Sequence, residues 1–206
     1  MHLDLVSLIK TGGPFLVTLI VFVETGLLIG FFLPGDSLLF TAGALASKGY
    51  INFWVLVVST PLAAIIGDAV GFRIGRKLGS KLYQKKDSFF FKKEHILKSE
   101  EFFSKHGGKS VILARFIPVV RTFTPVIAGA SNMHASKFTK YNVLGGLLWG
   151  VGLTTLGYLI GNSFGGEIDT IILPIIIGIV VLSILPGVVT LLVNKFRDSK
   201  KDVKSE

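Results

Sequence analysis

Long hydrophobic stretches separated by charged ones dominate the pattern of this chain. Residues 49–67, 141–166 and 170–194 contain no charged side chain. A helix needs about 20 apolar residues to span a bilayer, so the last two stretches are long enough, and the first reaches that length if it continues past Asp68. The pattern predicts three transmembrane helices, at about 53–76, 138–161 and 170–194.

Two other hydrophobic segments, residues 15–45 and 111–133, are interrupted by charged residues, glycines and prolines. The candidate breaks are Pro34, Gly35, Pro118 and Pro125. Proline removes a helical hydrogen bond and clashes with the preceding turn. Irregular backbone at membrane depth is tolerated only where protein covers it or where it lines a water-filled cavity. Each segment is therefore predicted to form a re-entrant helical hairpin or a broken helix, and the two face a shared cavity.

Short motifs recur between the two halves of the chain. Phe32-Leu33-Pro34 matches Phe116-Ile117-Pro118, Ala42-Gly43-Ala44 matches Ala128-Gly129-Ala130, and Gly71 and Gly75 match Gly157 and Gly161. Because one crossing separates the two hairpins, the repeats are expected to be inverted. Broken segments at corresponding positions of two halves point to a binding site near the midplane of the membrane.

These patterns predict an all-α integral membrane protein with one domain, residues 1–206. Two opposed re-entrant (broken) hairpins form an inverted repeat, together with about three transmembrane helices and a cytoplasmic interfacial helix. The expected parts are repeat 1 (about 15–79), an interfacial linker (about 80–107), repeat 2 (about 108–165), a C-terminal span (about 170–194) and a basic tail (195–206).

Composition and charge support a membrane protein and fix its expected orientation. Half of the residues are hydrophobic, 17% are charged and none is cysteine, which excludes disulfides and thiol catalysis. Residues 73–109 contain eleven Lys and Arg against four Asp and Glu, and residues 195–206 contain five against three. The positive-inside rule places both regions, including the C-terminus, in the cytoplasm, and it explains the net charge of +9 more simply than binding to nucleic acid.

Ionisable side chains within membrane segments are energetically unfavourable, so each is a functional candidate. The principal candidates are Glu24, Asp36, Arg115 and Arg121, and Asp68 lies nearer a boundary. Arginine presents a planar fork that matches phosphate oxygens, so the two arginines are candidate phosphate ligands. The two acids are candidates for proton coupling. The alternative interpretation is a pair of buried salt bridges that hold the hairpins together.

The same residues resemble the motifs of the DedA family, also called VTT or SNARE-associated membrane proteins, over about residues 15–165. One motif corresponds to Arg115, Phe116, Pro118 and Arg121, and another to Glu24 followed by Pro34-Gly35-Asp36. A third corresponds to Gly67, Asp68, Phe72, Gly75 and Arg76, with Phe72 where the family usually has tyrosine. This third motif makes Asp68 and Arg76 secondary site candidates.

The resemblance implies two opposed re-entrant hairpins in a bacterial cytoplasmic membrane, with Glu24, Asp36, Arg115 and Arg121 essential. It also implies a link to the proton motive force and to the cell envelope, and in some members the flipping of undecaprenyl phosphate. We therefore expect a proton-influenced flippase for a polyprenyl phosphate or another phospholipid, without enzymatic activity, cofactor or metal. A proton-coupled cation antiporter and a non-selective phospholipid scramblase are the alternatives. Monomer and homodimer both remain open.

Overall fold

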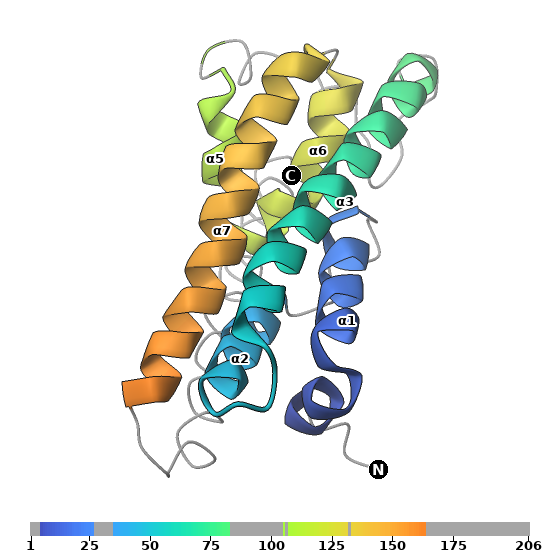
Figure 1. Cartoon of the computed structure of the whole chain (residues 1–206). Coiled ribbons are helices and arrows are strands. Elements are labelled where there is room, and N and C mark those ends of the chain that lie inside the picture. The colour runs from blue at the N-terminus through green and yellow to red at the C-terminus, as the bar shows by residue number, and fades with distance from the viewer. Residues whose placement is uncertain (1–4, 27–34, 83–104, 106, 132, 164–206) are drawn as a thin grey trace, which may run out of the picture.

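The computed structural model describes residues 5–26, 35–82, 105, 107–131 and 133–163. Within these ranges every regular element is a helix (Figure 1). The helices are α1 (Leu5–Gly26), α2 (Gly35–Ser47), α3 (Phe53–Leu82), α5 (Lys109–Ala114), α6 (Pro118–Ala130) and α7 (Ala135–Ser163). The all-helical class predicted from the sequence is therefore confirmed for the described part of the chain.

Three of these helices are long and apolar enough to cross a membrane. They contain the segments Ile9–Gly26, Phe53–Gly79 and Ala135–Ser163. The last two match the spans predicted at 53–76 and 138–161. The sequence analysis predicted that the segment beginning at residue 15 forms a hairpin or a broken helix. Helix α1 is itself long enough to span a membrane, with a kink at Gly13 (φ 57°) before Pro14. The predicted span at 170–194, the basic tail and nearly all of the interfacial segment 88–106 lie outside the described residues.

The second interrupted segment consists of two short helices joined by a turn. Helix α5 ends at Ala114, Ile117 is extended, and α6 begins at Pro118. The break predicted at Pro125 is wrong, because α6 continues through this proline to Ala130. Gly71 of α3 makes room for the ring, since a Cβ there would lie only 3.3 Å from Cβ of Pro125. Packing against α3 therefore offsets the unfavourable effect of an interior proline. At the other segment α2 begins at Gly35, and Pro34 lies outside the described residues.

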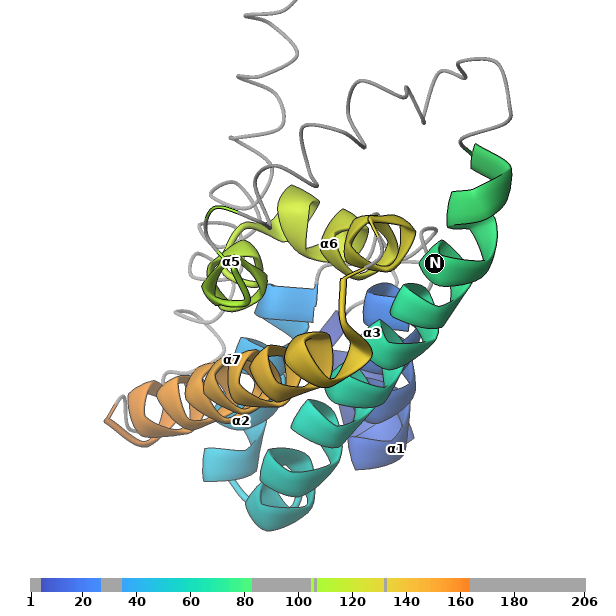
Figure 2. The same ribbon diagram turned by 90° about the horizontal axis from the view of Figure 1, so that it is seen from above.

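Short and long helices pack in two pairs, α2 against α7 and α6 against α3 (Figure 2). In the first pair Gly157 lies against the backbone of Phe40, and in the second Gly75 lies against the backbone of Val126. A Cβ on either glycine would overlap that backbone, so both contacts depend on glycine. The sequence repeat aligned Gly157 with Gly71, whereas the contacts relate Gly157 to Gly75, one helical turn further along α3.

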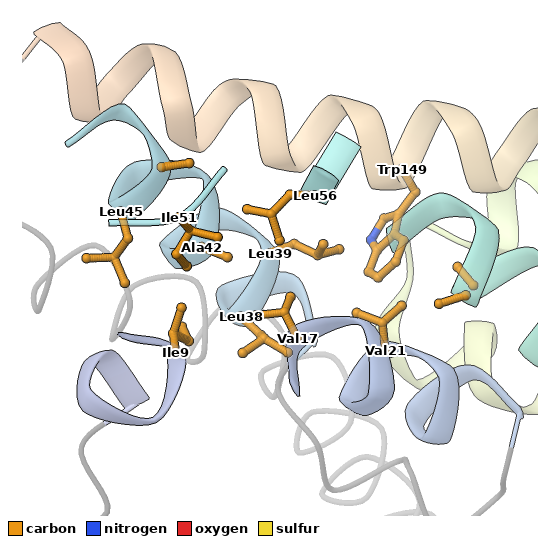
Figure 3. Packing of buried hydrophobic residues seen from close by; sticks show 13 residues of the cluster. Ile9, Val17, Val21, Leu38, Leu39, Ala42, Leu45, Ile51, Leu56 and Trp149 are labelled. Carbon is orange, nitrogen blue, oxygen red and sulfur yellow. The ribbon is translucent and has the colours of Figure 1, made fainter. Parts of the chain in front are cut away.

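The main apolar core joins α1, α2, α3 and α7. Its buried members include Val17, Val21, Leu38, Leu39 and Leu56, and Trp149 lies at one end of it (Figure 3). In contrast, many large apolar side chains on the outer faces of α3 and α7 are exposed, among them Trp54 at 73% and Leu148 at 58%. An apolar outer surface around a packed interior is the arrangement expected for helices that face lipid.

Candidate functional site

Glu24, Asp36 and Arg121 meet although they come from three different helices. Glu24 lies near the end of α1, Asp36 in the first turn of α2 and Arg121 one turn into α6. Arg121 donates from Nη2 to Oε1 of Glu24 and from Nη1 to Oδ1 of Asp36, each at 2.6 Å. Glu24 and Arg121 are buried, and Asp36 is largely buried. Both terminal nitrogens of Arg121 are thus paired with carboxylates.

The backbone of Gly35 lies directly against the Glu24 carboxylate. A Cβ at position 35 would overlap both oxygens and the carboxyl carbon of Glu24. A larger residue at position 35 would therefore displace the Glu24 carboxylate from the position in which it binds Arg121. The glycine that precedes Asp36 is a requirement of the ion-pair group itself.

Arg115 forms a second buried group with Asp68 of α3 and Asn142 of α7. Its Nη1 donates to Oδ2 of Asp68 and to Oδ1 of Asn142, each at 2.8 Å. The Asn142 amide donates in turn to the carbonyl of Ile65 at 2.9 Å. Arg115 directly follows the last residue of α5, so this group holds the α5–α6 turn against α3 and α7.

Trp149 of α7 lies beside both arginines. Its indole N–H donates to Oδ1 of Asp36 at 2.7 Å, the same oxygen that Arg121 binds. The guanidinium carbons of Arg121 and Arg115 lie 4.5 Å and 5.8 Å from the centre of its ring. Both distances are within the range of cation–π attraction. Trp149 therefore contacts both the Arg121 group and the Arg115 group.

The two guanidiniums differ in the atoms that remain available. Within the described part of the structure, buried Nε and Nη2 of Arg115 have no hydrogen-bond partner, nor has Nε of Arg121. Nε and Nη2 form one edge of the guanidinium, the geometry that binds two oxygens of a carboxylate or phosphate. With respect to the described residues, Arg115 thus presents a complete free edge, whereas Arg121 does not.

The structure brings together the four principal candidates, Glu24, Asp36, Arg115 and Arg121, and adds Asp68 to them. Arg76, the other secondary candidate, is exposed, and its guanidinium lies 5.8 Å from the ring of Phe72 and not in the cluster. The pairing also agrees with the alternative of buried salt bridges, since these ion pairs join α1 and α2 to α6, and α3 to the turn between α5 and α6.

Sequence reasoning missed Asn142 and Trp149. A signal existed for Asn142, because an amide inside the uncharged stretch 141–166 needs a buried hydrogen-bond partner. Trp149 carried no such signal, since tryptophan is common in membrane helices and at their ends.

Comparison with known proteins places this helical arrangement in a family. The VTT domain matches residues 33–159. Protein DedA of Escherichia coli K12 is 44% identical over 202 residues, which cover 95% of this chain and 91% of DedA. A Mycobacterium leprae membrane protein, ML0287, is 46% identical over 187 residues, 91% of this chain and 82% of the relative. The inner membrane protein YqjA of E. coli K12 is 37% identical over 149 residues, 72% and 68% of the two chains. No solved structure matches the chain significantly. By its VTT domain and these relatives, the chain belongs to the DedA family of membrane proteins.

Proposed function

We propose that this protein is a transporter that flips a polyprenyl monophosphate, such as undecaprenyl phosphate, across the bacterial cytoplasmic membrane. The observation that carries the proposal is the Nε–Nη2 edge of buried Arg115, which has no hydrogen-bond partner among the residues that the structure describes. A guanidinium edge that lacks a partner in a low-dielectric interior favours an anionic ligand, and a phosphate head supplies two oxygens at the spacing of that edge. The polyprenyl chain stays in the lipid while the head enters the cluster.

The charge of the cluster supports a link to protons. Three carboxyl groups, on Glu24, Asp36 and Asp68, face two guanidiniums, so full ionisation leaves one negative charge in excess. An incoming phosphate monoanion adds another. Excess charge of one sign is strongly unfavourable in a buried site, so anion entry is favoured when acids take up protons. In this proposal Arg115 and Arg121 hold the phosphate, and Glu24 and Asp36 control protonation.

The two similar helix pairs support the inverted-repeat part of the proposal. The contact of α2 with α7 and the contact of α6 with α3 use the same pattern of glycines against backbone. The inverted repeat places both basic regions, residues 73–109 and 195–206, on the cytoplasmic side. The chain has no cysteine, so single cysteines at Ser88, Ser163 and Ser199 are unambiguous probes. On intact cells an impermeant thiol reagent should label only the cysteine that replaces Ser163. Labelling of the cysteine at position 88 from outside would contradict this topology.

Transport by purified protein in liposomes tests the function. The wild type should move a labelled polyprenyl monophosphate between leaflets, and Arg115→Ala should move it much more slowly at equal protein content. A fluorescent phosphatidylcholine in the same vesicles controls for specificity. Equal movement of both lipids would favour a non-selective scramblase.

A proton-coupled cation antiporter is the second candidate, and the excess of one carboxyl in the cluster favours it. The two permanent positive charges oppose it, because each repels a cation in a buried site. Sodium and potassium flux measured in the same vesicles decides between the two. Cation flux that Arg115→Ala abolishes, with no lipid movement by the wild type, would overturn the flippase in favour of the antiporter.

A further inference from the structure

The position of Trp149 suggests a role in how the arginines exchange partners. Its ring packs at the end of the apolar core, where it extends from α7 toward Val21 of α1 (Figure 3). The side chain is 2% exposed, and its N–H binds Oδ1 of Asp36. The apolar packing therefore holds the donor in place independently of the arginines.

Arg121 cannot offer two nitrogens to an anion in the arrangement described. Nη1 is bound to Asp36 and Nη2 to Glu24, so only Nε remains. The Nε–Nη2 edge of Arg121 becomes available only when Glu24 leaves Nη2, and Nη1 can contact a phosphate oxygen only when Asp36 leaves it. A buried carboxylate that loses its donor is strongly unfavourable unless a second donor stays with it.

For Asp36 that second donor is present. Arg121 and Trp149 donate to the same oxygen, at 2.6 Å and 2.7 Å, from two different helices, α6 and α7. If Arg121 turns toward an anion, the indole N–H stays where the core packing holds it. The ring also lies within cation–π distance of both guanidiniums, so it can stay near Arg121 as that residue changes partner.

We propose that Trp149 is a positioning residue that retains Asp36 when Arg121 exchanges this carboxylate for the phosphate of a lipid phosphomonoester. The inference rests on the proposed function, which supplies the anion. In this role Trp149 neither binds the phosphate nor transfers a proton to it. It lowers the energetic penalty of the exchange by keeping the displaced carboxylate hydrogen-bonded.

Trp149→Phe tests this role, because phenylalanine keeps an aromatic ring in the core but lacks the N–H. In liposomes the concentration of polyprenyl monophosphate that gives half-maximal transport should rise about tenfold or more, as expected for loss of a hydrogen bond to a charged group. The maximal rate should change little. Trp54→Phe is the matched control, since Trp54 is exposed on α3 outside the cluster, and it should behave as the wild type.

Tryptophan fluorescence tests the same role without replacing Trp149. The chain contains only two tryptophans, so Trp54→Phe leaves Trp149 as the sole indole. Its emission should shift when polyprenyl monophosphate is added, because Arg121 leaves the oxygen that both donors share. The uncharged polyprenol should cause no shift. This measurement decides the question if Trp149→Phe does not reach the membrane.

The outcomes separate the two proposals. Failure of the wild type to move polyprenyl monophosphate overturns the proposed function and this inference with it. If the wild type transports the lipid, a Trp149→Phe protein with unchanged half-saturation overturns the role of Trp149 alone. Trp149 emission that does not respond to the lipid phosphate during transport overturns it equally.

Discussion

The two buried arginines lie six residues apart on either side of Pro118, yet they occupy different environments. Arg121 is held by two carboxylates, Glu24 from α1 and Asp36 from α2. Arg115 is held by one carboxylate, Asp68 of α3, and by the neutral amide of Asn142. Within the described residues Arg115 keeps a free Nε–Nη2 edge, and Arg121 keeps only Nε.

This difference indicates a division of roles. Both terminal nitrogens of Arg121 are bound to carboxylates. The main role of Arg121 is therefore to connect α1, α2 and α6. A guanidinium with a free edge retains the capacity for a further oxyanion, so Arg115 is the first contact expected for a phosphate. Four predictions test this division, beginning with the largest expected effect.

Arg121→Ala should destabilise the protein more than Arg115→Ala. Removing one partner of a buried ion pair typically costs about 3–5 kcal/mol, and loss of Arg121 leaves two carboxylates without their guanidinium where loss of Arg115 leaves one. Unfolding midpoints of the purified proteins in detergent measure the difference. Addition of Glu24→Gln and Asp36→Asn to Arg121→Ala should restore much of the lost stability. A larger loss for Arg115→Ala would contradict the comparison.

Arg115→Lys should abolish most transport while leaving stability close to that of the wild type. The ammonium group can still pair with Asp68, but it lacks the second nitrogen that forms the free edge. Arg121→Lys should lose both transport and stability, since one ammonium group cannot reproduce two separate carboxylate bonds. Transport and thermal unfolding are measured on the same preparations. Full transport by both lysine variants would mean that positive charge alone is sufficient.

Glu24→Gln and Asp36→Asn should reduce transport and make its rate less dependent on pH than in the wild type. Each change removes a titratable group that faces Arg121 but preserves the shape of the side chain. Asp68→Asn is the comparison on the Arg115 side. Rates in liposomes across a range of pH check the expectation. An unchanged pH profile in both Glu24→Gln and Asp36→Asn would exclude these acids as the proton-linked groups.

Arg76→Ala should have the smallest effect. Arg76 is exposed and contacts the ring of Phe72 outside the cluster, so its removal should change stability by no more than about 0.5 kcal/mol. Transport should equal that of the wild type at equal membrane abundance. A loss of transport comparable to that of Arg115→Ala would place Arg76 in the functional group and require a different description of the site.

The sequence by itself determined the helical class, two of the long spans and the charged residues that meet inside the protein. These predictions succeeded because the bilayer restricts the possible structures. A long uncharged stretch satisfies its backbone hydrogen bonds by forming a helix, and a charged side chain within the membrane needs a partner. Family membership was equally readable from resemblance, because the motifs around Glu24, Asp68 and Arg115 occur in the order that the DedA family has them.

Only the tertiary structure decided which acid pairs with which arginine. The partners of Arg121 are 97 and 85 residues away in the chain, and Asp68 is 47 residues from Arg115, so no local pattern relates them. Glycine contacts contribute to these pairings, since a Cβ at Gly35 would overlap the Glu24 carboxylate that binds Arg121. The same packing carries α6 through Pro125 and brings Trp149 near both arginines. Side chains on separate helices meet where backbones approach closely, and that approach depends on the whole set of helices together.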